Sequence, residues 1–332
     1  MMGRTAKTHK IGKKRTLKKG QNKAVLRGEA KGIDRITVVD DDGHSHQYPK
    51  KIIDIMGHSF SYNKTLGQGG FGHVLLYKNG NDTRAVKFYR YKDDMTMEKT
   101  NYEKLSRFPA IRQYIPTYYG SISKNDTYHG IILEKLEFDL YTLEKKKHTL
   151  SFRQIYDLLR EIINCLTEFH KAGVCINDLK PENMMIKHTI RKGKKIPRLY
   201  VIDLCLTSTQ LPNSHHCHTT QFDPPYVKVD NNKCRPQNDI WNFGVICFIF
   251  FLNIEWKTLQ RDYEGSTLKQ VVNNPYTSIE IDNFITDSQY NKSQKKWLKT
   301  LFQGVLNNDE SKRWNASKSS KHFKKGRELL KV

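Results

Sequence analysis

Apolar and polar residues alternate through the first part of the chain, as they do in half-buried β-strands. A short run of this kind covers residues 36–39, and the alternation becomes regular from residue 60. The pair Asn79-Gly80 between two apolar runs is a strong hairpin signal. The pattern therefore predicts a region dominated by strands over residues 60–135, in which the alternating apolar positions begin with Phe60, Tyr62 and Leu66.

The spacing of apolar residues changes to a helical period after residue 150. Ser151 and Gln154 form a capping-box sequence that predicts a helix start, and Gly173 predicts its end. Residues 243–254 are almost continuously apolar but too few to span a bilayer, so they predict a buried core helix. The helix after Ser151 carries apolar residues at i, i+3, i+4 and i+7, namely Ile155, Leu158, Leu159, Ile162, Leu166 and Phe169.

A strand-rich part followed by a helical part indicates an α+β fold with two unequal lobes and a cleft between them. Residues 1–30 are rich in lysine and lack aromatic residues and hydrophobic periodicity, which predicts a disordered tail. Residues 31–56 form a short extension before the regular pattern begins.

The charge of the chain is unusual, whereas its length and apolar content are those of an ordinary globular protein. The 332 residues include 57 Lys and Arg against 34 Asp and Glu, which gives a formal net charge of +23. The first 27 residues hold ten basic residues and no acidic one. This balance excludes an acidic solvating protein and favours polyanionic partners.

Six scattered cysteines and the absence of a signal peptide predict reduced thiols in the cytoplasm or nucleus, and not a secreted protein. No stretch predicts a transmembrane helix, so no membrane association is expected.

A glycine-rich sequence, G-x-G-x-x-G-x-V, contains Gly67, Gly69, Gly72 and Val74. Glycines at these places let backbone N–H groups approach phosphate oxygens without obstruction. Strand signals flank the sequence on both sides, unlike the strand-to-helix setting of dinucleotide folds. Taken alone, an ordinary glycine-rich hairpin explains it as well.

Ala85 and Lys87 follow in the next strand, where alternation places both side chains on one face. A small residue and a cation would then face the cleft beneath the glycine-rich sequence. A single lysine in a strand is more often a solvated residue at a sheet edge. Lys87 therefore indicates a functional site only in combination with the other motifs.

Two further segments carry the strongest signal. Asp178, Lys180 and Asn183 lie within six residues and offer a proton acceptor, a phosphate-facing cation and a metal-binding amide. An apolar strand, residues 199–202, then ends in Asp203. Asn183 and Asp203 could together hold Mg²⁺, which prefers oxygen ligands and bridges phosphates.

These elements in this order resemble the eukaryotic-type serine/threonine protein kinases, over about residues 58–323. The resemblance implies a bilobal kinase-like fold, with a kinase domain over 57–323, an N-lobe over 57–135, a C-lobe over 136–323 and a basic end over 324–332. It also implies that the chain transfers the γ-phosphate of ATP to protein hydroxyls with Mg²⁺ or Mn²⁺.

The resemblance also assigns roles to single residues. Asp178 would accept the substrate proton, Lys180 would face the γ-phosphate, and Asn183 and Asp203 would bind the metal. Lys87 would pair the α- and β-phosphates and form an ion pair with a helix glutamate, for which we expect Glu103 rather than Glu98. The ATP-binding residues would be Leu66, Gly67, Gly69, Gly72, Val74, Ala85, Lys87, Glu134, Leu136 and Met185, with residues 134–136 as the hinge.

Three positions depart from the family pattern. Asn177 stands where the family has an arginine that receives an activation-loop phosphate, so we expect activity independent of that phosphorylation. Cys205 replaces the glycine after the metal-binding aspartate, and Tyr226 replaces the glutamate that would pair with Arg313. Another acidic residue could pair with Arg313, or a contact between Tyr226 and Arg313 could replace the ion pair.

The principal alternative is a pseudokinase scaffold that binds partners or nucleic acid through its basic surface. The tail could bind nucleic acid, an acidic protein or an import receptor, and its Lys13-Lys14-Arg15 cluster has nuclear-localisation character. The divergent motifs resemble those of kinases encoded by large DNA viruses or of a diverged parasite kinase. We expect the protein in the nucleus or cytoplasm, and in the host-cell nucleus if it is viral.

Overall fold

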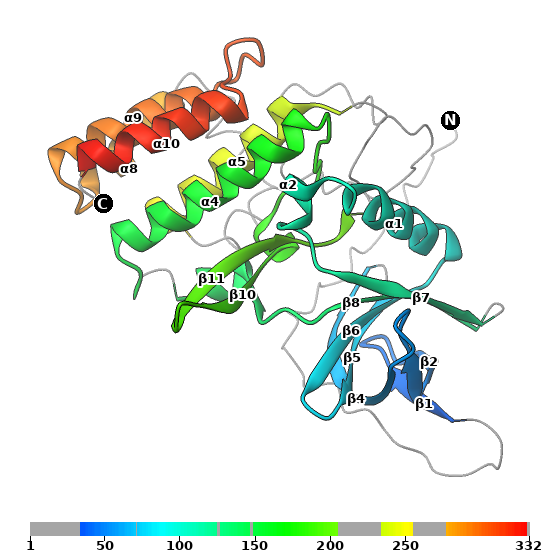
Figure 1. The fold of residues 1–332 in the computed structure, drawn as a ribbon. Helices are drawn as coiled ribbons and strands as arrows, with labels where there is room; N and C mark the ends of the chain where they lie inside the picture. The colour runs from blue at the N-terminus through cyan, green and yellow to red at the C-terminus, as the bar shows by residue number, and fades with distance from the viewer. Residues whose placement is uncertain are drawn as a thin grey trace, which may run out of the picture.

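The computed structural model describes residues 34–70, 72–124, 127–146, 149–204, 234–254 and 277–330. The tail predicted for residues 1–30 lies outside these ranges, as do Cys205 and Tyr226. The described chain folds into a strand-rich lobe and a helical lobe, which appear at the bottom and top of Figure 1. The predicted α+β, bilobal architecture is therefore confirmed.

The strand-rich lobe is built on a six-stranded antiparallel sheet with the order β3-β4-β5-β6-β8-β7. The predicted hairpin at Asn79-Gly80 joins two of its strands, where Asn79 pairs with Asp82. The six strands are β3 (Lys51–Ile53), β4 (Ser59–Gly69), β5 (Gly72–Asn79), β6 (Asp82–Tyr89), β7 (Tyr118–Lys124) and β8 (Tyr128–Glu134).

A two-stranded hairpin, β1 (Arg35–Val39) and β2 (Ser45–Pro49), precedes this sheet. Its apolar side chains Ile36, Val38 and Tyr48 are buried in the same cluster as sheet residues that include Phe60 and Phe88. The extension therefore adds a layer to the outer side of the sheet, and burial of its apolar residues holds it there.

Helix α1 (Lys92–Leu105) lies against strands β6, β7 and β8 and is followed by the short α2 (Pro109–Arg112) (Figure 1). Helix α4 (Phe152–Lys171) begins at the predicted capping box, where Ser151 and Gln154 exchange side-chain and backbone hydrogen bonds. It ends before Gly173, whose φ of 72° suits glycine.

Helix α5 (Pro236–Phe251) is the predicted core helix, and its residues from Asp239 to Phe251 are all buried. It packs against α4 and α9, and α9 packs in turn against α8 and α10. The remaining helices are α3 (Leu140–Glu144), η2 (Pro181–Asn183), α8 (Thr277–Asp287), α9 (Lys292–Val305) and α10 (Ala316–Leu330).

A three-stranded sheet lies between the two lobes, with β9 (Phe138–Asp139), β10 (Met184–Arg191) and β11 (Lys194–Val201) in the order β11-β10-β9. The expectation of reduced thiols is wrong for two cysteines, because Cys175 and Cys234 form a disulfide with a Cα–Cα distance of 5.1 Å. The two residues are 59 positions apart, and packing of α4 against α5 brings them together.

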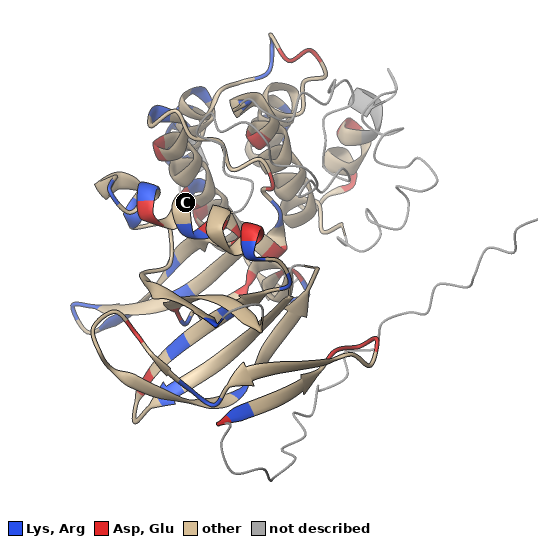
Figure 2. Ribbon diagram, turned by 90° about the vertical axis from the view of Figure 1, so that its right-hand side faces the viewer, with Lys and Arg blue, Asp and Glu red and all other residues tan. Residues whose placement is uncertain are grey.

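Lysines and arginines are spread over strands and helices of both lobes in the view of Figure 2. No described helix combines the length and the apolar composition that crossing a membrane requires.

Candidate active site

The glycine-rich sequence forms the turn between β4 and β5, as the strand signals on both sides predict. Gly69 pairs with Gly72 across this hairpin, and Gly67 pairs with Val74. Gly72 has a φ of 142°, and a Cβ atom there would lie 2.1 Å from the carbonyl oxygen of Phe88. Only glycine fits at this position, because the neighbouring strand β6 approaches it too closely.

Lys87 lies on β6, and its ammonium group bridges two carboxylates. Lys87 Nζ is 2.6 Å from Glu98 Oε2 on α1 and 3.0 Å from Asp203 Oδ1. The Glu98 side chain is fully buried and also accepts hydrogen bonds from the Tyr89 hydroxyl at 2.6 Å and the Leu204 N–H at 3.2 Å. Glu98 therefore connects the sheet, helix α1 and the segment after Asp203.

The expectation that Glu103 pairs with Lys87 is wrong. Glu103 forms an i,i+4 ion pair with Lys99 at 2.8 Å, and 42% of its side chain is exposed. Residues five positions apart on an α-helix point about 140° apart, so Glu98 and Glu103 cannot share a face. A signal was present in the sequence, since Glu98 shares the helical spacing of the buried residues Met95, Tyr102 and Leu105.

The segment after α4 brings Asp178, Lys180 and Asn183 together. Asn183 Nδ2 donates to Asp178 Oδ2 at 2.8 Å and to the Asp178 carbonyl at 3.0 Å, and Lys180 Nζ lies 2.8 Å from Asp178 Oδ2. Asp178 and Asn183 are buried, with 8% and 6% of each residue exposed. These bonds fix the orientation of the Asp178 carboxylate, as a group that accepts a proton from a substrate requires.

A buried carboxylate on α5 binds the backbone immediately before Asp178 by hydrogen bonds. Asp239 Oδ2 accepts hydrogen bonds from the Ile176 N–H and from His170 Nε2, both at 2.9 Å, and Oδ1 accepts from the Asn177 N–H at 2.8 Å. Asn177 has a φ of 62°, a left-handed conformation uncommon for residues other than glycine. No local signal in the sequence indicates this contact, because Asp239 lies 62 residues beyond Asn177.

The two predicted metal ligands lie on adjacent segments, because the Ile202 N–H donates to the Asn183 carbonyl at 2.9 Å. The Asn183 amide nitrogen is bound to Asp178, which leaves its Oδ1 as the donor for a cation. Asp203 has a φ of 59° and a partly exposed carboxylate. An amide and a carboxylate oxygen form a donor set that fits a hard cation such as Mg²⁺.

The predicted hinge, residues 134–136, begins at the last residue of β8. The Glu134 carboxylate binds Lys187 Nζ at 2.5 Å and the Thr117 hydroxyl at 3.1 Å. Burial opposes ionisation of Glu134, but these hydrogen bonds outweigh it and hold its pKa below the usual 4.5. The Glu134 side chain is therefore bound within the protein, and the Glu134 backbone N–H also donates to the Thr117 carbonyl at 2.9 Å.

The other predicted nucleotide contacts come from strands β4, β6 and β10 and from the segment after β8. Ala85 pairs with Leu133 across β6 and β8, Leu136 is buried, and Met185 lies on β10 opposite Asp139 of β9. Leu66, on β4, is partly exposed.

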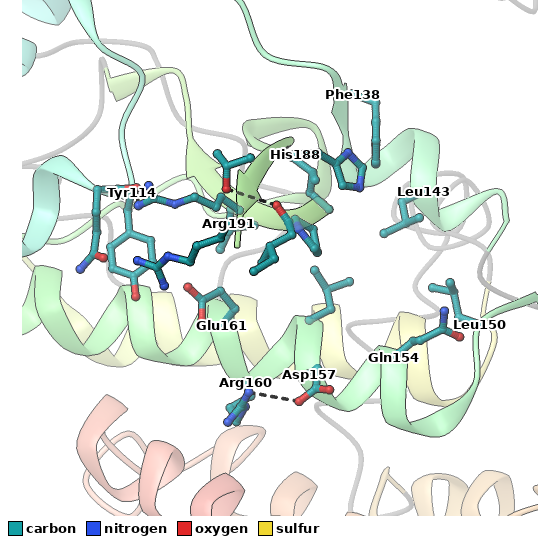
Figure 3. A pocket seen from close by; sticks show the side chains of 18 of the residues that line it. Tyr114, Phe138, Leu143, Leu150, Gln154, Asp157, Arg160, Glu161, His188 and Arg191 are labelled. Atoms are coloured by element: carbon teal, nitrogen blue, oxygen red, sulfur yellow. Dashed lines mark hydrogen bonds and ion pairs between the residues drawn. The ribbon is translucent and has the colours of Figure 1, made fainter. Parts of the chain in front are cut away.

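A pocket of about 850 Å³ lies elsewhere in the helical lobe, between α4 and the β10–β11 hairpin (Figure 3). Its lining includes Tyr114, Leu158 and His188 but none of the predicted catalytic, metal-binding or nucleotide-binding residues. It is therefore distinct from the candidate active site.

Arg313 has partners that the sequence did not suggest. Its Nε donates to the Asn307 carbonyl and its Nη1 to the Gln237 carbonyl, each at 3.0 Å, and its guanidinium lies 4.9 Å from the Trp241 ring. Burial lowers the pKa of Arg313 to about 10. Within the described ranges, backbone carbonyls and an indole take the place of an acid.

Comparison with known proteins agrees with this geometry. A family model described as protein kinase domain matches residues 60–323. Calcium-dependent protein kinase 4 of Plasmodium falciparum is 25% identical over 290 residues, which cover 81% of this chain and 52% of that protein. A fowlpox virus protein named "Probable serine/threonine-protein kinase" is 29% identical over 184 residues, or 50% of this chain and 59% of that protein.

A crystal structure of the Rad53 kinase domain and SCD2 matches with a TM-score of 0.58 at 19% identity, over 79% of this chain and 86% of that chain. This likeness shows the fold. Among eight curated relatives, this chain spans between 31% and 65% of their length.

Proposed function

Because the chain belongs to the protein kinase family, we propose that it transfers the γ-phosphate of ATP to serine and threonine hydroxyls of proteins. The observation that carries this proposal is the cluster in which Asp178, Lys180 and Asn183 contact one another beside Asp203 and Lys87. Phosphoryl transfer depends mainly on positioning and on electrostatic stabilisation, and the cluster supplies groups for both.

Each residue has a chemical task in this proposal. The Asp178 carboxylate orients the substrate hydroxyl and accepts its proton, while Lys180, 2.8 Å away, offers a cation to the transferred phosphate. Asn183 and Asp203 hold the divalent cation, which neutralises phosphate charge when it is bound. Lys87 binds the α- and β-phosphates, and Glu98 holds its ammonium group in place.

Protein kinases use ATP and a divalent cation, and we propose Mg²⁺ or Mn²⁺ here because both predicted ligands offer oxygen atoms. The proposed specificity for serine and threonine rests on Lys180, since the resemblance links a lysine at this position to that class. Three relatives at 25% to 29% identity are named probable serine/threonine-protein kinases, which agrees with it.

We propose in addition that activity does not require phosphorylation of the activation loop. In the family pattern, an arginine beside the catalytic aspartate pairs with the loop phosphate. Here the Asn177 side chain cannot form that pair, and the Asn177 backbone N–H donates to the buried carboxylate of Asp239. The catalytic segment therefore has an internal anchor that needs no phosphate.

The basic tail, residues 1–30, is proposed to bring the enzyme to nucleic acid, to an acidic protein or to an import receptor, with action in the nucleus or cytoplasm. The support for this is its composition alone.

A transfer assay tests the main proposal. The purified full chain, labelled ATP and Mg²⁺ are incubated with a serine/threonine substrate and, separately, with a tyrosine substrate. We expect transfer to the first only, with a loss of at least 100-fold in Asp178→Asn and Asp203→Asn. Glu103→Gln is the matched control, because this exposed carboxylate has no assigned role.

Absence of transfer from the unmodified protein with Mg²⁺ and with Mn²⁺ would leave the pseudokinase scaffold as the better explanation. Phosphatase treatment before the assay should change the rate less than twofold. A near-complete loss would contradict independence from loop phosphorylation.

A further inference from the structure

Helix α1, which packs against the six-stranded sheet (Figure 1), buries two polar side chains. Glu98 and Asn101 lie three positions apart, so they share one face of the helix with the buried Met95 and Tyr102. No more than 3% of either polar residue is exposed. A polar group buried on such a face costs free energy unless it is hydrogen-bonded, whereas an apolar side chain carries no such cost. An amide at this position therefore indicates a specific hydrogen-bond partner.

The partner of Asn101 is the backbone of Leu204, the residue that follows the predicted metal ligand Asp203. Asn101 Nδ2 donates to the Leu204 carbonyl at 2.6 Å. The Leu204 N–H donates to Glu98 Oε1 at 3.2 Å. Two side chains of α1 thus bind both backbone polar groups of Leu204, which lies 103 positions from Asn101 in the sequence.

The side chain of Leu204 adds a third contact. It is fully buried, in the core cluster that also contains Met95 and Tyr102. The N–H, the carbonyl and the side chain of Leu204 are therefore each held by α1 or by the core, and close packing leaves the residue little freedom to rotate.

Asp203 lies between two anchored neighbours. On one side, the Ile202 N–H donates to the Asn183 carbonyl at 2.9 Å, and on the other side is Leu204. Asp203 has a φ of 59°, a conformation that a residue other than glycine keeps only where its surroundings determine it. The contacts of Leu204 provide this constraint on the C-terminal side of Asp203.

We infer that Asn101 is a positioning residue for the divalent cation, because its bond to the Leu204 carbonyl fixes the backbone that directs the Asp203 carboxylate. The inference rests on the cation-binding part of the proposed function. Asp203 Oδ1 also lies 3.0 Å from Lys87 Nζ. That contact does not set the direction of the carboxylate, since the flexible lysine side chain can follow it.

A purely structural role for Asn101 leads to a different expectation. The bond to Leu204 would then contribute to stability only, as we expect of the bond at 3.1 Å from Ser320 Oγ to Asn164 Oδ1, which joins α10 to α4. A positioning role requires in addition that cation binding weakens when the bond is removed. The cation dependence of nucleotide binding separates the two roles and needs no phosphoryl transfer.

Binding of the fluorescent nucleotide N-methylanthraniloyl-ADP to the full chain, measured over a series of Mg²⁺ concentrations, tests the inference. Asn101→Leu removes the amide and nearly keeps the size of the side chain. Because a buried carbonyl is left unpaired, the Mg²⁺ concentration for half-maximal binding should rise about tenfold. Binding in excess EDTA should stay within about twofold of the unmodified chain, because the groups that face the nucleotide itself are unaltered.

A second variant and a matched control accompany this measurement. Asn101→Ala should give the same rise in Mg²⁺ requirement, and it cannot crowd the core as leucine could. Asn164→Leu also removes one amide hydrogen bond between two segments, but away from the site. It should lower the melting temperature and leave the Mg²⁺ requirement within about twofold. Thermal melting checks that each variant is folded.

The inference is overturned if the folded Asn101 variants need no more Mg²⁺ than the unmodified chain, or if Asn164→Leu raises the requirement equally. It is also overturned if nucleotide binding by the unmodified chain does not depend on Mg²⁺, because Asp203 then holds no cation. A chain that binds the nucleotide with Mg²⁺ but transfers no phosphate contradicts phosphoryl transfer alone, and the Mg²⁺ series still decides the role of Asn101.

Discussion

The buried contact between Lys87 and Glu98 gives the sharpest test of the site, because the sequence alone favours Glu103. Replacement of Glu98 by glutamine removes one charge while keeping the size and one acceptor oxygen of the side chain. The carboxylate is fully buried and accepts hydrogen bonds from the Lys87 ammonium group and the Tyr89 hydroxyl, each at 2.6 Å. A hydrogen bond that involves a charged group contributes about 1.5 to 3 kcal/mol, so we expect a loss of about 2 kcal/mol.

The loss should appear in stability and in catalysis. A domain of this size loses about 2 °C in melting temperature per kcal/mol, which predicts a decrease of about 4 °C for Glu98→Gln. If Lys87 is misplaced by the same free energy in the transition state, kcat/KM should fall by about 30-fold. Differential scanning calorimetry and a steady-state transfer assay measure the two quantities.

Glu103→Gln is the matched control on the same helix. Its ion pair with Lys99 is solvent-exposed and contributes less than about 1 kcal/mol. It should melt within 2 °C of the unmodified protein and keep its kcat/KM within twofold. If both variants behave alike, or if Glu103→Gln is the more damaging, the reasoning from the buried network is refuted.

Three further predictions concern stability. Asp239→Asn should lower the free energy of unfolding by about 3 kcal/mol, because the NH₂ of the new amide would face backbone N–H groups that now donate to the carboxylate. Denaturant titration measures this loss. Tyr48→Phe should cost about 1 to 3 kcal/mol, because it leaves His73 Nδ1 buried without its 2.8 Å partner, and thermal melting checks this. Burial lowers the pKa of His73 and of His322 below 6.5. The unfolded chain therefore binds protons near pH 6.5 that the folded protein does not, so the melting temperature should fall as pH decreases below 6.5, and less steeply in His73→Gln.

Local signals predicted most of the fold. The capping box at Ser151, the hairpin at Asn79-Gly80 and the end of α4 before Gly173 each depend on residues within a few positions of one another. A short stretch of sequence is enough to predict such features, because their hydrogen bonds and backbone angles involve only neighbouring residues.

Contacts between distant segments were not predictable in the same way. The Cys175–Cys234 disulfide exists only because α4 and α5, which are far apart in the sequence, pack together. The error at Glu103 has a different cause, because the helical period, which places Glu98 on one face with Met95 and Tyr102, is a local signal that favours Glu98.

The departure at Asn177 shows how a catalytic segment can lose a family side chain and keep its geometry. The bonds that hold Ile176 and Asn177 to Asp239 use backbone N–H groups, which every residue except proline possesses. Substitutions at positions 176 and 177 therefore leave these bonds intact, provided that the residue tolerates a positive φ at 177, and asparagine is among the residues that do so best. The constraint that keeps Asp178 in place lies 62 residues beyond Asn177, at a carboxylate whose exposed surface is 0%.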